Sequence, residues 1–162
     1  DPKVRAALSL QLAKAVGGQG MVGGQAIDMM MQQISANIGT ITRSQQLKTG
    51  ALIEFACESG AILSHAVPQL RHALHAFAHD LGLAFQITDD LLDAEGNSDD
   101  LGKGVRKDVA AGKPTFVSLL GADRARTQAS FLASQAIEHL EPFAENAEFL
   151  KRLARFVVTR NT

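Results

Sequence analysis

The sequence predicts an all-α fold. Apolar residues recur at helical spacing along most of the 162 residues, and no segment shows the apolar–polar alternation of a half-buried strand. No internal repeat and no linker rich in proline, serine or glycine divides the chain. We therefore expect residues 1–162 to form a single domain, a bundle of helices around one core.

Composition excludes several classes of protein. Lys and Arg number 16 against 17 Asp and Glu, so no basic field for nucleic acid is present. The only cysteine, Cys57, excludes an internal disulfide and favours a reducing, cytoplasmic location; within an apolar helical run, it is expected to pack inertly. No apolar run reaches membrane-spanning length, and no signal peptide is visible.

The first expected helix runs from Pro2 to about Val16, because Asp1 can cap it and proline is tolerated at the first helical position. Its apolar residues at helical spacing are Val4, Leu8, Leu12 and Ala15.

Residues 17–28 hold five glycines in eight positions and a formal GxGxxG pattern. No strand precedes the pattern, so a dinucleotide site is rejected. Glycines are costly in a helix, and close helix–helix packing is their default explanation. The alternative is close approach of a ligand, for which Gln25 and Asp28 would supply polar groups.

Residues 33–43 are expected to form a loop or weak helix. The segment from about Ser44 to His65 is apolar on nearly all sides, which predicts a helix buried in the middle of the bundle. Lys48 lies near its start, where its ammonium group either reaches solvent or faces a cavity.

A long central helix is expected from Pro68 to Asp93. His72, His75 and His79 share one of its faces. Their spacing allows a zinc site, but no cysteine and no acidic second shell is expected with them, so surface histidines are the preferred interpretation.

The end of this helix carries three carboxylates within five positions, Asp89, Asp90 and Asp93, preceded by Gln86. Asp89 and Asp93 are four residues apart and lie on one face. Clustered carboxylates favour a hard divalent cation such as Mg²⁺, which keeps waters and accepts phosphate ligands. The alternative is a solvated acidic helix end.

Residues 94–111 are expected to form a charged loop that supplies cations directly after these carboxylates. Together the two groups are what a metal–diphosphate ligand requires. The alternative is a set of weak surface ion pairs. The cations are Lys103, Arg106 and Lys107 in this loop, and Lys113 just after it.

Two amphipathic helices complete the chain, from about Asp123 to Leu140 and from about Asn146 to Thr159. Their expected inward residues are Ala125, Ala129, Leu132, Ala136 and Leu140 in the first, and Phe149, Leu153, Phe156 and Val157 in the second.

Taken together, the motifs resemble the trans-type polyprenyl diphosphate synthases, most of all the short-chain farnesyl and geranylgeranyl diphosphate synthases. The resemblance spans the whole chain. The motifs are Gly23-Gly24-Gln25-x-x-Asp28, Lys48-Thr49-Gly50, Phe85-Gln86-x-x-Asp89-Asp90-x-x-Asp93, Gly102-Lys103 with Asp108, and Gly112-Lys113-x-Thr115-Phe116.

The resemblance implies an isoprenoid-synthase-type helical bundle around a central cavity, usually a homodimer. It implies a Mg²⁺-dependent prenyltransferase that condenses an allylic diphosphate with isopentenyl diphosphate to farnesyl or geranylgeranyl diphosphate.

It also implies roles for single residues. Asp89 would be the principal metal ligand, and Asp90 and Asp93 would complete the cluster through waters or hydrogen bonds.

The implied catalytic residues are Lys48, Thr49, Gln86, Asp89 and Lys103. The implied substrate-binding residues are Gln25, Asp28, Lys48, Phe85, Gln86, Lys103 and Lys113. The lysines would bind the allylic diphosphate, and Phe85 would lie near isopentenyl diphosphate.

The family carries two aspartate-rich motifs, and this sequence contains one, the second. Because the sequence begins with Asp1 and not with methionine, we expect it to be the C-terminal half of a synthase. This half is expected to be inactive by itself, and the length of the product cannot be read from it. Two other functions stay open: a non-catalytic subunit or paralogue that binds diphosphate or a partner synthase, and a class I terpene cyclase.

Overall fold

The computed structural model describes residues 1–31, 37–95 and 114–161, and within these ranges the chain is helical with no strand. The all-α prediction is therefore confirmed. The helices are α1 (Pro2–Val16), α2 (Met21–Met30), α3 (Ile38–Gln45), the π-helix η1 (Gln46–Gly50), α4 (Ala51–Leu63), α5 (Pro68–Glu95), α8 (Phe116–Leu120), α9 (Ala122–His139), the 3₁₀ helix η2 (Glu141–Ala147) and α10 (Glu148–Thr159).

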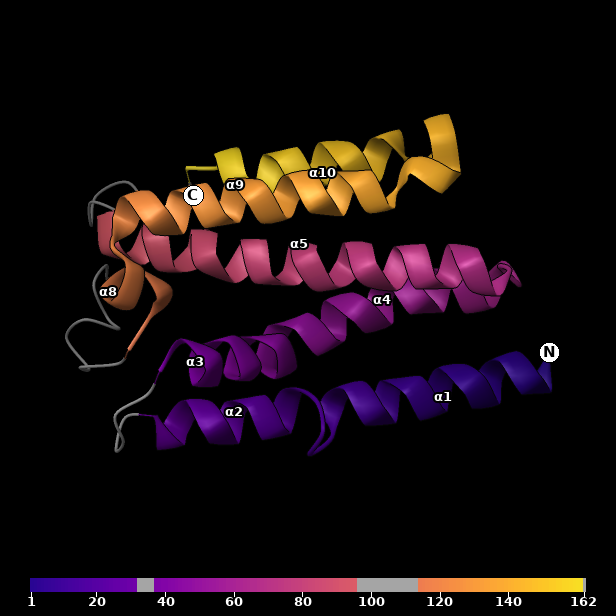
Figure 1. The fold of residues 1–162 in the computed structure, drawn as a ribbon. Helices are drawn as coiled ribbons and strands as arrows, with labels where there is room; N and C mark the ends of the chain where they lie inside the picture. The colour runs from indigo at the N-terminus through magenta and orange to yellow at the C-terminus, as the bar shows by residue number, and fades with distance from the viewer. Residues whose placement is uncertain (32–36, 96–113, 162) are drawn as a thin grey trace.

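The long helix α5 lies in the middle of the arrangement (Figure 1). Helices α9 and α10 run along one side of it, and α4 with η1 packs on the other. Helix α1 packs on α4, and α2 packs on η1. The short helix α8 lies near the C-terminal end of α5.

The core consists of two clusters strung along α5. Phe77 and Leu81 centre the first with residues of α9 and α10, and Ile87 and Leu91 centre the second with α9, Met31 and other residues. The expected inward face of α9 is confirmed, because each of its predicted residues is buried: Ala125, Ala129, Leu132, Ala136 and Leu140.

The expected inward face of α10 is wrong in three of its four residues. Phe149, Leu153 and Phe156 are 75%, 37% and 58% exposed, whereas Val157 is buried as expected. The helix carries two adjacent apolar stripes, and the one that faces the core includes the small Ala154, which lets α10 lie close to its neighbours.

The segment predicted as a loop or weak helix is helical in its described part, and its residues 33–36 lie outside the described residues. Helix begins at Ile38, where the Asn37 side chain accepts a hydrogen bond from the backbone N–H of Thr40 at 3.0 Å and caps the helix. Helix α4 is not buried all round: Ala61 is its only buried residue. In the described part of the chain, α4 packs mainly against α1, α5 and η1, which leaves its remaining apolar surface partly exposed.

Helix α1 begins as predicted, with the Asp1 carboxylate accepting from the backbone N–H of Lys3 at 2.7 Å. Of its apolar residues at helical spacing, Ala15 is buried but Leu12 is exposed, and the helix packs mainly on α4.

Cys57 packs against the core cluster of Phe77 and Leu81, as the sequence predicted. Burial, with a smaller contribution from the Glu54 carboxylate, raises the pKa of its thiol from 9.0 to about 11. Low thiolate content makes this cysteine a poor nucleophile. Among the described helices, none combines the length and apolar character that crossing a membrane requires.

Candidate functional site

The π-turn η1 lies between two close glycine crossings. A Cβ added to Gly24 of α2 would lie 2.2 Å from the backbone nitrogen of Lys48, and one added to Gly82 of α5 would lie 3.2 Å from the Cα of Gly50. Close packing, the default explanation for the glycines, is therefore confirmed at Gly24. The Ser44 hydroxyl adds a hydrogen bond to the Gly24 carbonyl at 3.2 Å. These contacts hold the backbone of Lys48 and Thr49 between α2 and α5.

Lys48 and Asp28 form an ion pair across the first of these crossings. The Lys48 ammonium lies 2.7 Å from Asp28 Oδ2, and the two side chains are 32% and 8% exposed. Gln25, one turn earlier on α2, is exposed. Lys48 is thus held by a buried carboxylate and keeps partial access to solvent.

Asp89 near the end of α5 is paired with a residue that the sequence interpretation missed. The guanidinium group of Arg160, the residue that follows α10, forms an ion pair with Asp89 Oδ1 and lies 4.4 Å from the centre of the Phe85 ring. Gln86 Nε2 lies 3.5 Å from Asp89 Oδ2, at the limit of a hydrogen bond. The Arg160 side chain is 15% exposed and that of Asp89 44%, so the carboxylate remains reachable from solvent.

Asp90 faces a different neighbour. It is buried, and its Oδ2 accepts a hydrogen bond from the backbone N–H of Phe116 at 2.9 Å, at the start of α8. Thr115 caps the same helix through a capping box with Ser118. Asp90 therefore ties α8 to α5, while Asp89 and Asp93 share another face of the helix because they are four residues apart.

These oxygen donors suit a hard cation, but they do not form a complete cage. Within the described ranges, no three His, Cys, Asp or Glu side chains converge on a possible metal position. Asp89 and half-buried Asp93 would supply two carboxylates, and a cation such as Mg²⁺ takes its remaining ligands from water and phosphate. Lys103 and Lys113 lie outside the described residues, so their predicted roles stay predictions.

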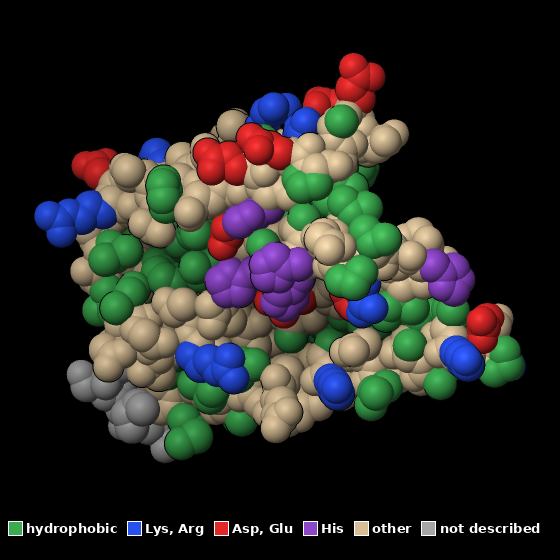
Figure 2. All heavy atoms as spheres, turned by 45° about the vertical axis from the view of Figure 1, so that its right-hand side comes forward, with side chains coloured by type: hydrophobic (Ala, Val, Ile, Leu, Met, Phe, Trp, Pro, Cys, Tyr) green, Lys and Arg blue, Asp and Glu red, His purple; other side chains and the backbone are tan. Residues whose placement is uncertain are grey.

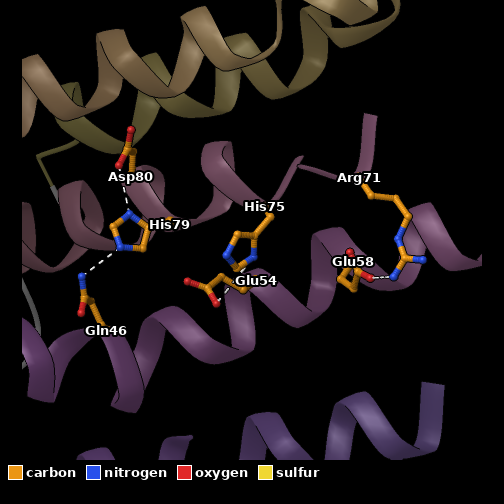
Figure 3. Close-up of polar contacts among 7 residues, drawn as sticks. All are labelled: Gln46, Glu54, Glu58, Arg71, His75, His79 and Asp80. Carbon is orange, nitrogen blue, oxygen red and sulfur yellow. Dashed lines mark hydrogen bonds and ion pairs between the residues drawn. The ribbon is translucent and has the colours of Figure 1, made fainter. Parts of the chain in front are cut away.

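Contrary to expectation, acidic side chains accompany two histidines of α5: Glu54 lies beside His75, and Asp80 beside His79. Figure 2 shows histidines and acidic side chains gathered on one face of the molecule. His72 and His75 are exposed, as expected, but His79 is half-buried and bonded on both ring nitrogens, to Gln46 and to Asp80. These pairs, with the two others on the same side of α5, are drawn in Figure 3. No metal cluster is found among them in the part of the chain that the structure describes, so nothing here supports a zinc site. The other two pairs are Arg71 with Glu58 and His75 with Glu54 at 3.9 Å.

Two of these pairs line a groove of about 450 Å³ between α1, α4 and the start of α5. Its charged lining residues are Lys14, Glu54, Glu58 and Arg71, two of each sign, so the groove presents little unbalanced charge. The groove contains none of the residues expected to bind substrate.

Comparison with known proteins gives one consistent result. The family model described as polyprenyl synthetase matches residues 7–153. A dimethylallyltranstransferase of Fischerella ambigua is 40% identical over 151 residues, which cover 93% of this chain and 44% of that protein. The farnesyl diphosphate synthase of Escherichia coli is 36% identical over 165 residues, which cover 97% of this chain and 54% of that protein.

Solved structures agree. An FPP/GFPP synthase of Zymomonas mobilis, crystallised in an apo form, matches with a TM-score of 0.85 and 48% identity over 97% of this chain and 52% of that one. A geranyltransferase of Helicobacter pylori, complexed with magnesium and isoprenyl diphosphate, matches with a TM-score of 0.81 and 27% identity over 98% of this chain and 52% of that one. The chain therefore spans about half the length of these relatives.

Proposed function

The chain belongs to the polyprenyl synthetase family, and on that premise we propose that the protein is a trans-prenyltransferase. It condenses an allylic diphosphate with isopentenyl diphosphate to a short-chain product, farnesyl or geranylgeranyl diphosphate. One observation carries the proposal: a lysine and a carboxylate lie on two helices that pack together. Lys48 lies on η1 and Asp89 on α5, and η1 packs against α5 at Gly82.

Lys48 is the cation that binds the allylic diphosphate. Its ammonium group now pairs with Asp28, and a substrate phosphate would replace or share that partner. Because Asp28 is buried beside the glycine crossing, it keeps Lys48 at the edge of the site before substrate arrives. Lys103 and Lys113 are proposed to add positive charge around the same diphosphate.

Asp89 and Asp93 are the carboxylates proposed to hold Mg²⁺. Both are accessible to some degree, and both offer the oxygen ligands that this ion prefers. Asp90 acts indirectly, because its bond to Phe116 fixes the rotation of this end of α5 against α8. When Mg²⁺ is bound here with the diphosphate, it supplies charge neutralisation for the leaving group.

The proposed reaction breaks the allylic C–O bond, and pyrophosphate leaves with the bonding electron pair. The isopentenyl double bond then bonds to the allylic carbon, and loss of a proton restores a double bond. Gln86, Thr49 and Gln25 are expected to line the reaction centre, and Phe85 the isopentenyl position. Arg160 keeps the Phe85 ring and the Asp89 carboxylate in one arrangement by contacting both.

Two further features belong to the proposal. The low cysteine content supports a cytoplasmic location. A homodimer is expected, and light scattering on the purified protein would show twice the monomer mass.

The test is an assay of the protein expressed from its complete coding sequence, with an allylic diphosphate, labelled isopentenyl diphosphate and Mg²⁺. A longer linear diphosphate is expected. Asp89→Asn should abolish its formation, whereas Asp123→Asn, an exposed carboxylate on α9, serves as the matched control. A cyclic hydrocarbon would favour the terpene cyclase alternative, and diphosphate binding without turnover would favour the non-catalytic subunit.

A further inference from the structure

A line of polar contacts crosses α5 from α9 to the π-turn. His139 Nε2 of α9 lies 3.0 Å from Asp80 Oδ2, and Asp80 Oδ1 lies 3.1 Å from His79 Nδ1. His79 Nε2 then lies 2.9 Å from the side-chain Nε2 of Gln46, the first residue of η1. Figure 3 shows the section from Asp80 to Gln46, with the His79 ring between the two other side chains.

The chemistry of the donors sets the direction of each bond. The Gln46 amide nitrogen only donates, so His79 Nε2 must accept. The neutral imidazole then carries its proton on Nδ1 and donates it to Asp80. Asp80 accepts a second hydrogen bond, from His139, so both of its carboxylate oxygens have a partner. The Asp80 side chain is 14% exposed. Asp80 therefore selects the His79 tautomer that can hold Gln46.

Gln46 needs such an anchor because of where it lies. A π-turn contains one residue more than an α-helical turn, and it persists where surrounding contacts hold it. Relaxation to an α-helical turn would change the direction in which Lys48 and Thr49 point by about 100°. The glycine crossing between Gly82 and Gly50 brings η1 close to α5, but backbone contact alone does not fix how far one element slides along the other. The hydrogen bond from Gln46 to His79 fixes the position of η1 along α5, because His79 lies three residues before Gly82.

We propose that His79 and Asp80 are positioning residues, which act through Gln46 to hold the π-turn so that Lys48 and Thr49 face the allylic diphosphate. The effect on substrate rests on the proposed function. The effect on the π-turn does not, because it follows from the contacts alone.

Five variants test the proposal. His79→Leu and Gln46→Leu each remove the bond from one side, and the double variant carries both replacements. His79→Gln keeps a side-chain oxygen that can accept from Gln46. His72→Leu is the matched control, because this exposed histidine lies two turns earlier on the same helix. His79 is itself 41% exposed, so its replacement leaves no buried cavity.

The first measurement is hydrogen exchange of the amides in residues 46–50. Loss of the bond should speed exchange roughly 3- to 10-fold in His79→Leu and Gln46→Leu, and the double variant should show no further increase. His79→Gln should remain within two-fold of wild type, and His72→Leu should match it. Wild-type exchange in the two leucine variants would overturn the proposal.

The second measurement is the KM for each substrate and the binding of inorganic pyrophosphate with Mg²⁺ by calorimetry. The leucine variants should raise the allylic KM and the pyrophosphate Kd roughly 3- to 10-fold, and leave the isopentenyl KM unchanged. Faster exchange with unchanged allylic KM and pyrophosphate Kd would also overturn the positioning role. If wild type neither turns over substrate nor binds pyrophosphate, the proposed function and the effect on substrate are both refuted. Hydrogen exchange alone then decides whether His79 holds the π-turn through Gln46.

Discussion

Replacing Gly24 by alanine tests the close crossing of α2 and the π-turn. The added Cβ would lie 2.2 Å from Lys48 N, 2.6 Å from Lys48 Cα and 2.8 Å from the carbonyl carbon of Leu47. All three are backbone atoms, which cannot rotate away as the end of a side chain can. Helix α2 must therefore move outward, and Asp28 on the next turn moves with it away from Lys48.

The free energy of unfolding changes through three contributions, one stabilising and two destabilising. Alanine is favoured over glycine in a helix by about 1 kcal/mol. Overpacking costs about 1–3 kcal/mol, and contact with backbone places this site at the upper end of that range. Outward movement also lengthens the bond from the Ser44 hydroxyl to the Gly24 carbonyl, which is worth about 1 kcal/mol. The net expectation is a loss of about 1–3 kcal/mol.

Urea unfolding followed by circular dichroism measures this loss. Gly60→Ala is the control, because Gly60 lies inside α4 and an added Cβ there meets nothing within 4 Å. It should stabilise the protein by up to about 1 kcal/mol, so the same chemical change should have opposite signs at the two positions. If Gly24→Ala unfolds at the same or a higher urea concentration than wild type, the crossing is not as close as described.

The remaining predictions concern single side chains. Asp89→Ala should lower turnover at least about 100-fold in steady-state kinetics, and turnover within a few-fold of wild type would exclude Asp89 as a metal ligand. Lys48→Met should raise the KM for the allylic diphosphate roughly 10-fold or more, and an unchanged KM would exclude Lys48 from that site. Arg160→Met should tighten Mg²⁺ binding several-fold by calorimetry, because its guanidinium group competes for Asp89; equal affinity would disprove the competition. Cys57 in the folded protein should react with a thiol reagent at pH 8 roughly 100-fold more slowly than in urea, since its pKa is raised from 9.0 to about 11 and the thiolate fraction falls accordingly.

Helix positions were readable from the sequence where one apolar stripe dominates. Helix α9 was predicted within one residue at each end, and its inward face is as expected. Helix α10 carries two stripes of similar apolar character, and periodicity cannot rank them. In the structure Ala154 and Val157 pack in the core beside α9 and α5, whereas Phe149 and Phe156 are exposed. Which side meets these neighbours depends on tertiary packing, so it is absent from the pattern of the helix itself.

The site shows the same division between local pattern and tertiary placement. The motif around Asp89 and the lysine before Gly50 were found in the sequence because each is a local run of residue types with a chemical purpose. Arg160 was missed because its partners lie 71 and 75 residues earlier in the chain, and only the packing of α10 on α5 brings it to Asp89 and Phe85. Its one local signal was a cation directly after an amphipathic helix, a common feature with several explanations. The partnership of His79 with Gln46 is hidden for the same reason. A histidine on the polar side of a helix looks solvent-exposed until a neighbouring element supplies a donor, and here that element is a π-turn whose extra residue no periodicity could have indicated.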